Sequence, residues 1–175
     1  WAWCAIKNVV IRMAFSTTRP SLKSRALRYL AAREHSRAEL AAKLSRHVAD
    51  DDAPDAVERV LDELAAKGFI DEARVAESVL HRRAGRLGGA RVLHELRAKG
   101  LPDDVMAEAA EQLRATELAR AREVWRRKFG QPPADAAERA RQLRFLAARG
   151  FSGDVARRAV GRSEEHTSEL QSHSG

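Results

Sequence analysis

The stretch LHELRAKGL (Leu93–Leu101) combines the two signals that decide the fold. Leu93 and Leu96 are three residues apart, a spacing that puts apolar side chains on one face of a helix. Lys99 then suits the negative end of a helix dipole, and Gly100 can adopt the left-handed conformation that commonly ends a helix. The stretch therefore predicts a short amphipathic helix that stops at Gly100.

Similar stretches occur at LDELAAKGF (Leu61–Phe69) and LRFLAARGF (Leu143–Phe151). All three end in a basic residue, a glycine and an apolar residue, which is one way of stopping a helix. A more regular series is formed by AELAAKL (Ala38–Leu44), HELRAKG (His94–Gly100) and RFLAARG (Arg144–Gly150). The corresponding leucines, 56 and 50 residues apart, are Leu40, Leu96 and Leu146. This series predicts a tandem repeat, with each segment near the end of the second helix of its unit.

Apolar residues recur at helical spacing from residue 21 to residue 161, and no stretch shows the sustained alternation of a strand. We predict an all-α, elongated tandem array of three three-helix-bundle repeats, with nine helices in total. Separate helices are expected at about 102–113 and from Thr116 onward. The expected limits are 1–20 for a flexible lead-in, 21–69 for repeat 1, 70–115 for repeat 2, 116–161 for repeat 3 and 162–175 for a disordered tail.

Several polar residues indicate where helices begin. Ser36 followed by Glu39 is the pattern of a capping box, in which each side chain accepts a hydrogen bond from the backbone of the other residue. Asp71 and Thr116 are further expected caps. The acidic run 50–52 and Pro54 suit the first turn of the third helix, so we interpret that run as capping rather than as a calcium site.

The two ends of the chain differ from the sequence between them. We expect the native start at Met13, which precedes a polar segment. RSEEHTSELQSHSG (Arg162–Gly175) has no helical apolar periodicity and resembles the conceptual translation of a sequencing-library adapter, with a natural disordered tail as the alternative. The histidines of this segment are therefore excluded from the candidate site.

The excess of positive charge lies in the last third of the chain. Residues 114–161 contain 12 Lys and Arg against 5 Asp and Glu, whereas residues 13–67 contain 10 against 9 and residues 68–113 contain 7 against 8. Guanidinium groups at this density suit phosphates or an acidic protein surface, and a solvated surface is the alternative. The binding candidates are Arg82, Arg83, Arg86, Arg91, Arg120, Arg122, Arg126, Arg127, Lys128, Arg141, Arg144, Arg157 and Arg158.

The sequence contains no pattern of an enzyme, a metal site or a membrane span. Cys4 is the single cysteine, and the histidines form no arrangement with Ser, Asp or Cys. GRLGGAR (Gly85–Arg91) follows a predicted helix and lacks the Lys-Ser/Thr of a phosphate loop, so we interpret it as a linker. No apolar run is long enough to cross a bilayer. We therefore expect a cytoplasmic monomer without catalytic activity, cofactor or metal.

The segments ALRYLAAREHSRAELAAKL (Ala26–Leu44) and VLDELAAKGFIDEARVAESVLHRRAGRLGGARVLHELRAKGL (Val60–Leu101) resemble the RecX family, bacterial modulators of the RecA recombinase. The resemblance covers about residues 22–161. Val75 departs from it, because the family commonly has an aromatic residue there. The resemblance implies a partner, the RecA nucleoprotein filament. It further implies binding in the filament groove, with inhibition of ATP hydrolysis, strand exchange, filament growth and LexA cleavage.

Two other functions are compatible with the residues alone. Three-helix units are also found in autonomous DNA-binding proteins, which would bind duplex DNA selectively, by its sequence, without RecA. Direct contact with single-stranded or duplex DNA through the basic repeat 3 is a separate expectation. No predicted helix begins with the cluster of Asn, Gln and Arg that reads base edges, which argues against sequence-specific binding. A helical adaptor that binds neither RecA nor DNA is the second alternative.

Overall fold

The computed structural model describes residues 20–50 and 52–161. The expected start at Met13 and the expected tail at 162–175 lie outside the described residues. The described part contains eight α-helices, a short 3-10 turn and no strand. These elements are α2 (Leu22–Ala32), α3 (Arg37–Leu44), η1 (Ser45–His47), α4 (Ala56–Ala66), α5 (Glu72–Arg83), α6 (Gly89–Ala98), α7 (Asp103–Lys128), α8 (Ala136–Ala148) and α9 (Gly153–Val160).

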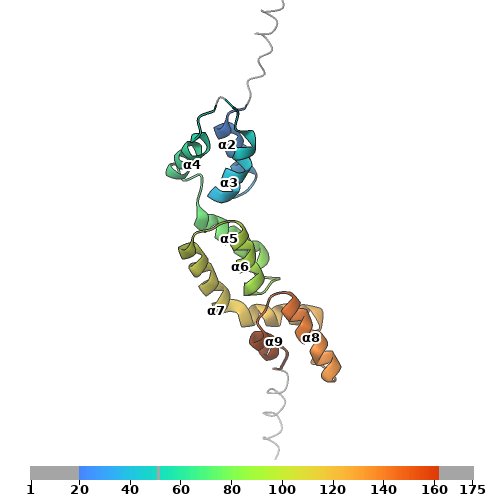
Figure 1. The fold of residues 1–175 in the computed structure, drawn as a ribbon. Helices are drawn as coiled ribbons and strands as arrows, with labels where there is room; N and C mark the ends of the chain where they lie inside the picture. The colour runs from blue at the N-terminus through green and yellow to red at the C-terminus, as the bar shows by residue number, and fades with distance from the viewer. Residues whose placement is uncertain (1–19, 51, 162–175) are drawn as a thin grey trace, which may run out of the picture.

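The helices form a long molecule in which successive parts of the chain follow one another in space (Figure 1). Helices α2–α4 lie at one end, α5 and α6 lie in the middle, and α8 and α9 lie at the other end, with α7 running between the last two groups. The predicted all-α, elongated fold is therefore confirmed.

Three separate apolar cores hold the molecule together, and we name the bundles after them. Bundle 1 consists of α2, α3 and α4, and its buried residues are Leu22, Ala26, Leu40, Leu44, Leu61, Leu64 and Ile70. Bundle 2 consists of α5, α6 and the first part of α7, around Val75, Ala76, Val79, Val92, Leu96, Leu101, Ala109 and Leu113. Bundle 3 consists of the rest of α7 with α8 and α9, around Ala121, Val124, Leu146, Phe151, Ala156, Ala159 and Val160.

The leucines of the repeated series occupy the same place in each bundle. Leu40, Leu96 and Leu146 lie on α3, α6 and α8, the second helix of each bundle, and all three have no exposed surface. Helices of this length are marginal alone in water, so their stability comes from burying such side chains against neighbours. Val75, the residue that departs from the RecX pattern, is also buried, in the core of bundle 2.

The prediction of nine separate helices is wrong for the described residues, because α7 is one continuous helix of 26 residues. It contains neither glycine nor proline, so nothing in its sequence interrupts the backbone hydrogen bonds. Thr116 does not cap a new helix. Its hydroxyl instead donates to the Gln112 carbonyl within α7 and accepts from Arg120 Nε, each at 3.0 Å. Bundles 2 and 3 therefore share a helix.

Most of the predicted helix ends are confirmed. Ser36 Oγ accepts from the Glu39 N–H at 3.1 Å, and Glu39 Oε2 accepts from the Ser36 N–H at 3.2 Å, which completes the capping box. Asp71 caps α5 by accepting from the Arg74 N–H at 3.1 Å. Gly100 ends its helix with a φ of 69°.

The predicted start of the third helix is wrong. Helix α4 begins at Ala56, two residues after Pro54, and its first residue is preceded by Asp55, which makes no side-chain capping bond. Asp52 instead accepts from the Ala49 N–H at 2.7 Å and so stabilises the preceding loop. Asp52 therefore shapes a turn ahead of the helix.

Bundles 2 and 3 also meet backbone to backbone. The N–H of Gly88, in the loop between α5 and α6, donates to the Arg149 carbonyl at 2.8 Å. A Cβ atom at Gly88 would lie 2.1 Å from the carbonyl carbon of Gly150, so only glycine allows this approach. The segment predicted to be a linker therefore fastens bundle 2 to the turn between α8 and α9.

Candidate interaction surface

Three candidate cations lie in the last turn of α7. Arg126, Arg127 and Lys128 are all exposed. Arg126 Nη1 lies 2.7 Å from Glu123 Oε2, and Arg127 Nε lies 2.8 Å from Glu123 Oε1. Exposed pairs of this kind contribute only about 0–1 kcal/mol, so a partner with phosphates or carboxylates can replace Glu123 at small cost.

Helices α8 and α9 add four more exposed candidates. Arg141 lies 3.1 Å from Glu138 and 5.6 Å above the centre of the Phe129 ring. Arg144 makes no ion pair within the described residues. Arg157 and Arg158 each lie 3.8 Å from Asp154, a long distance for an ion pair. The basic surface predicted for repeat 3 therefore consists of exposed side chains on all three helices of bundle 3.

A cleft lies where the α5–α6 loop of bundle 2 meets α7 and α8 of bundle 3. We call it the junction cleft. Its volume is about 280 Å³, and its lining residues are Gly85, Arg86, Val124, Arg127, Lys128, Phe145 and Arg149. Three of its four cations, on two different bundles, are binding candidates from the sequence. The tertiary fold brings them together, which helical spacing alone does not indicate.

Arg149 is the member of the junction cleft that sequence reasoning missed. Its guanidinium carbon lies 3.6 Å from the centre of the Phe145 ring, so the two groups stack. In the sequence, Arg149 belongs to the helix-ending pattern LAARG, and we assigned it only a role at the end of α8. One residue therefore belongs both to the helix-ending pattern and to the lining of the junction cleft.

Arg120 is a structural residue rather than a surface cation. Its Nη1 donates to the carbonyls of Ala84 and Leu87 at 2.9 and 2.7 Å, and its Nη2 donates to the Leu113 carbonyl at 2.9 Å. Burial lowers the pKa of the Arg120 guanidinium. The bonds to Ala84 and Leu87 fasten the end of α5 and its loop to α7, and the bond to Leu113 lies within α7, so Arg120 is removed from the binding candidates.

Most of the remaining candidates are held by contacts within the protein. Arg122 is half-buried, with its Nε inside the structure. Arg83 lies 3.0 Å from Glu95, and Arg82 Nε donates to the Ser78 carbonyl at 3.0 Å. The stem of Arg91 packs against the turn between α8 and α9, where it leaves no room for a side chain at position 150. Among the candidates outside bundle 3, Arg86 is therefore the one best placed to contact a ligand.

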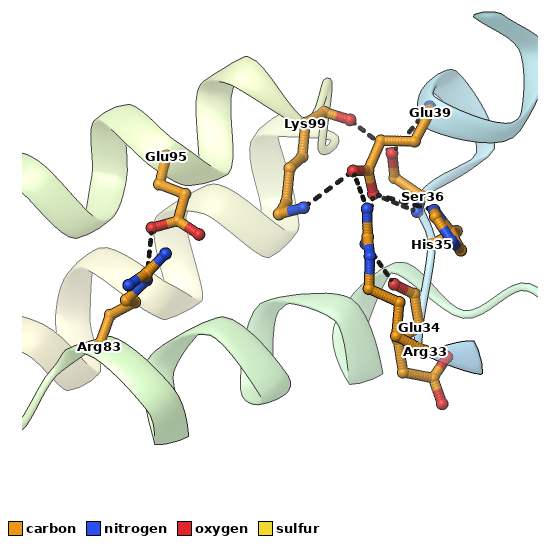
Figure 2. Close-up of polar contacts among 8 residues, drawn as sticks. All are labelled: Arg33, Glu34, His35, Ser36, Glu39, Arg83, Glu95 and Lys99. Atoms are coloured by element: carbon orange, nitrogen blue, oxygen red, sulfur yellow. Dashed lines mark hydrogen bonds and ion pairs between the residues drawn. The ribbon is translucent and has the colours of Figure 1, made fainter. Parts of the chain in front are cut away.

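Polar side chains join bundle 1 to bundle 2 (Figure 2). Ser36 Oγ donates to the Lys99 carbonyl at 2.5 Å, and Lys99 Nζ lies 2.9 Å from Glu39 Oε1. Burial alone would raise the pKa of Glu39, but hydrogen bonds from Arg33, Lys99 and the Ser36 N–H lower it to about 2. His35 is almost fully buried beside this network, and burial together with nearby Arg33 lowers its pKa. The carboxylate of Glu39 is therefore the centre of this contact.

Within residues 20–50 and 52–161, His, Cys, Asp and Glu form no group of three or more suited to a metal ion. No helix in that part of the chain has the length and apolar character needed to cross a membrane.

Comparison with known proteins gives a consistent result. Models of the three RecX three-helix domains match the chain in order, at residues 23–64, 71–109 and 115–160. The regulatory protein RecX of Leptothrix cholodnii is 60% identical over 148 residues, which cover 85% of this chain and 92% of that protein. The regulatory protein RecX of Ralstonia nicotianae is 53% identical over 140 residues, which cover 80% and 86%.

Solved structures agree on the fold. The crystal structure of RecX from Lactobacillus salivarius aligns with a TM-score of 0.67 at 18% identity, over 80% of this chain and 92% of that one. The domain matches follow the three bundles, and each of the two relatives aligns with at least 80% of the chain. The chain therefore belongs to the RecX family of regulatory proteins.

Proposed function

We propose that this protein binds the filament that RecA forms on DNA and restrains its ATP hydrolysis, strand exchange and coprotease activity. The observation that carries the proposal is the arrangement of three joined bundles in one long molecule with exposed cations at one end. Membership of the RecX family supports RecA as the partner. A cytoplasmic monomer without its own catalytic step is sufficient for this activity.

A long molecule is suited to binding a filament because several weak contacts with neighbouring subunits together give a high affinity. Once one bundle is bound, the others are held near neighbouring subunits, and their effective concentration can reach the millimolar range. Affinity gained in this way needs no single deep pocket. A molecule that bridges subunits can also oppose the rearrangements that accompany each ATPase cycle, provided that it binds one filament state more tightly than another.

The direct test is the rate of ATP hydrolysis by RecA on single-stranded DNA, measured with and without the protein. We expect the rate to fall as the protein is added, to a plateau at saturation. An unchanged ATPase rate at protein concentrations that saturate any binding to the filament would contradict the proposal and favour the helical adaptor.

A charge-reversal variant tests the basic surface of bundle 3. We choose Arg126→Glu/Arg127→Glu, because both side chains are exposed, and leave Arg122 unchanged, because its Nε is buried. This variant should inhibit RecA less, with a smaller dependence on salt. The matched control is Arg28→Glu/Arg59→Glu, which makes the same charge change at exposed positions of bundle 1. Equal inhibition by the two variants would show that the bundle 3 cations have no particular role.

A further inference from the structure

The junction cleft differs in charge from another cleft of similar size. The cleft between α5 and α7 has a volume of about 340 Å³ and is lined by one arginine, Arg74, and two glutamates, Glu77 and Glu108. The junction cleft is lined by four cations and no carboxylate. Both volumes are near the lower end of the range of about 300–1,000 Å³ for ligand pockets, so the junction cleft suits one unit of a polymer.

The positive charge of the junction cleft is largely uncompensated. Arg86, Lys128 and Arg149 form no ion pair with any carboxylate of the described residues, and Arg127 pairs only with the exposed Glu123. Cations gathered in one shallow cleft attract an anion more strongly than the same cations spread over a whole surface. The ligand that this arrangement favours therefore carries negative charge.

The junction cleft also contains a planar stacking surface. The Arg149 guanidinium stacks on Phe145, and Phe145 in turn contacts Phe129 edge to face with ring centres 5.1 Å apart. The Arg149 backbone is held as well, because its carbonyl accepts the hydrogen bond from Gly88. Aromatic rings and guanidinium planes are the groups on which proteins stack nucleobases. An acidic peptide side chain would use the cations but not this surface.

We propose that the junction cleft binds one nucleotide of a single-stranded nucleic acid. Arg86, Arg127 and Lys128 contact the phosphate, and the base lies against the stacked pair of Arg149 and Phe145. No Asn, Gln, Asp or Glu side chain lines the cleft to read a base edge, so binding does not depend on sequence. This site goes beyond the proposed function, because it binds nucleic acid in the absence of RecA.

The first test measures binding without RecA. The anisotropy of a fluorescein-labelled oligothymidylate of about 20 nucleotides is titrated with the full chain and with Arg86→Ala/Lys128→Ala. The slope of log K against log salt falls by about 0.7 for each phosphate that is no longer neutralised, so the double variant should lose about 0.7 from the slope for the one phosphate in the cleft. At about 0.1 M salt this corresponds to a loss of affinity of about fivefold. The matched control is Arg28→Ala/Arg59→Ala in bundle 1.

The second test places a charge in the junction cleft without removing a cation. A Cβ atom at Gly85 meets nothing within 4 Å, so a side chain fits there. Gly85→Glu and Gly85→Gln have the same size and differ in charge. We expect Gly85→Glu to weaken oligonucleotide binding several-fold relative to Gly85→Gln, while both variants unfold at the same urea concentration.

Two results would overturn the inference. One is that Arg86→Ala/Lys128→Ala binds the oligonucleotide as tightly as the bundle 1 control. The other is that polyglutamate competes as well as unlabelled oligothymidylate, which would show that the cleft binds an acidic protein surface.

The RecA assay separates this inference from the proposed function. Lost oligonucleotide binding with RecA inhibition intact supports both, whereas oligonucleotide binding without any RecA inhibition would contradict the proposed function alone.

Discussion

Replacing Gly88 with alanine should break the backbone contact between bundle 2 and the turn between α8 and α9. The new Cβ would lie 2.1 and 2.2 Å from the Gly150 carbonyl carbon and oxygen, and 2.2 Å from the Phe151 nitrogen. All of these are backbone atoms, so no side-chain rotation relieves the clash. Non-bonded carbon atoms normally lie about 3.5–4.0 Å apart, so the loop must move by about 1.5 Å.

The cost of this movement can be estimated from its two components. Forcing extra volume into a packed site costs about 1–3 kcal/mol, and losing the hydrogen bond from Gly88 to Arg149 costs about 1 kcal/mol more. We therefore expect the free energy of unfolding to fall by about 2–4 kcal/mol, and the melting temperature to fall by roughly 5–15 °C.

The neighbouring glycine provides the matched control. A Cβ atom at Gly89 would meet its nearest neighbour, Glu117 Oε1, at 3.6 Å, which is an ordinary contact. Gly89 is also the first residue of α6, where alanine favours the helix. Urea and thermal unfolding followed by circular dichroism should show Gly89→Ala as stable as the original protein or more so. Free energies of unfolding within about 0.5 kcal/mol of each other for Gly88→Ala and Gly89→Ala would show that the backbone contact at Gly88 contributes little to stability.

Three further predictions concern stability. The pKa of Glu39 is about 2, below its ordinary value of 4.5, so its carboxylate stabilises the fold above pH 4.5 and this stabilisation is lost as the pH falls toward 2. The free energy of unfolding is measured with urea at about pH 7 and at about pH 3. The free energy lost on acidification should be about 1 kcal/mol smaller in Glu39→Gln than in the original protein, allowing for solvent screening. An identical loss in the two proteins would contradict this prediction. Arg120→Lys keeps the charge but cannot donate to all three carbonyls, so thermal unfolding should show a cost of about 1–3 kcal/mol, and an unchanged melting temperature would rule out the structural role. Leu96→Ala should cost about 2–5 kcal/mol in urea unfolding because Leu96 has no exposed surface. Phe69→Ala, at a side chain that is 47% exposed, should change stability by less than about 0.5 kcal/mol and serves as its control.

Local signals in the sequence predicted the bundles well. Apolar spacing placed Leu40, Leu96 and Leu146 in three cores, and the capping box at Ser36 and Glu39 marked the start of α3. Each of these signals involves residues within about two turns of one helix, where periodicity and hydrogen-bonding chemistry are decisive. Such features can be read without knowledge of the tertiary structure.

The errors had two causes, one local and one that depends on distant segments. Thr116 has the side chain of a capping residue, but the adjoining residues favour a helix on both sides, and its hydroxyl bonds within α7. The predicted linker around Gly88 contacts Gly150, more than 60 residues away, and no local pattern records such a contact. The same contact brings Arg86 to Arg149, so the junction cleft could not be predicted from the distribution of charge along the chain.

The continuity of α7 has a consequence for the size of targets that the protein can contact at two points. A helix of 26 residues is about 39 Å long, and without glycine or proline it resists bending and compression. The outer surfaces of bundles 2 and 3 are therefore held at a constant separation. A polymer whose subunits repeat in step with that separation is contacted by both bundles at once. A polymer with a different repeat is contacted by only one of them, so the stiffness of a single helix can select the spacing of the partner.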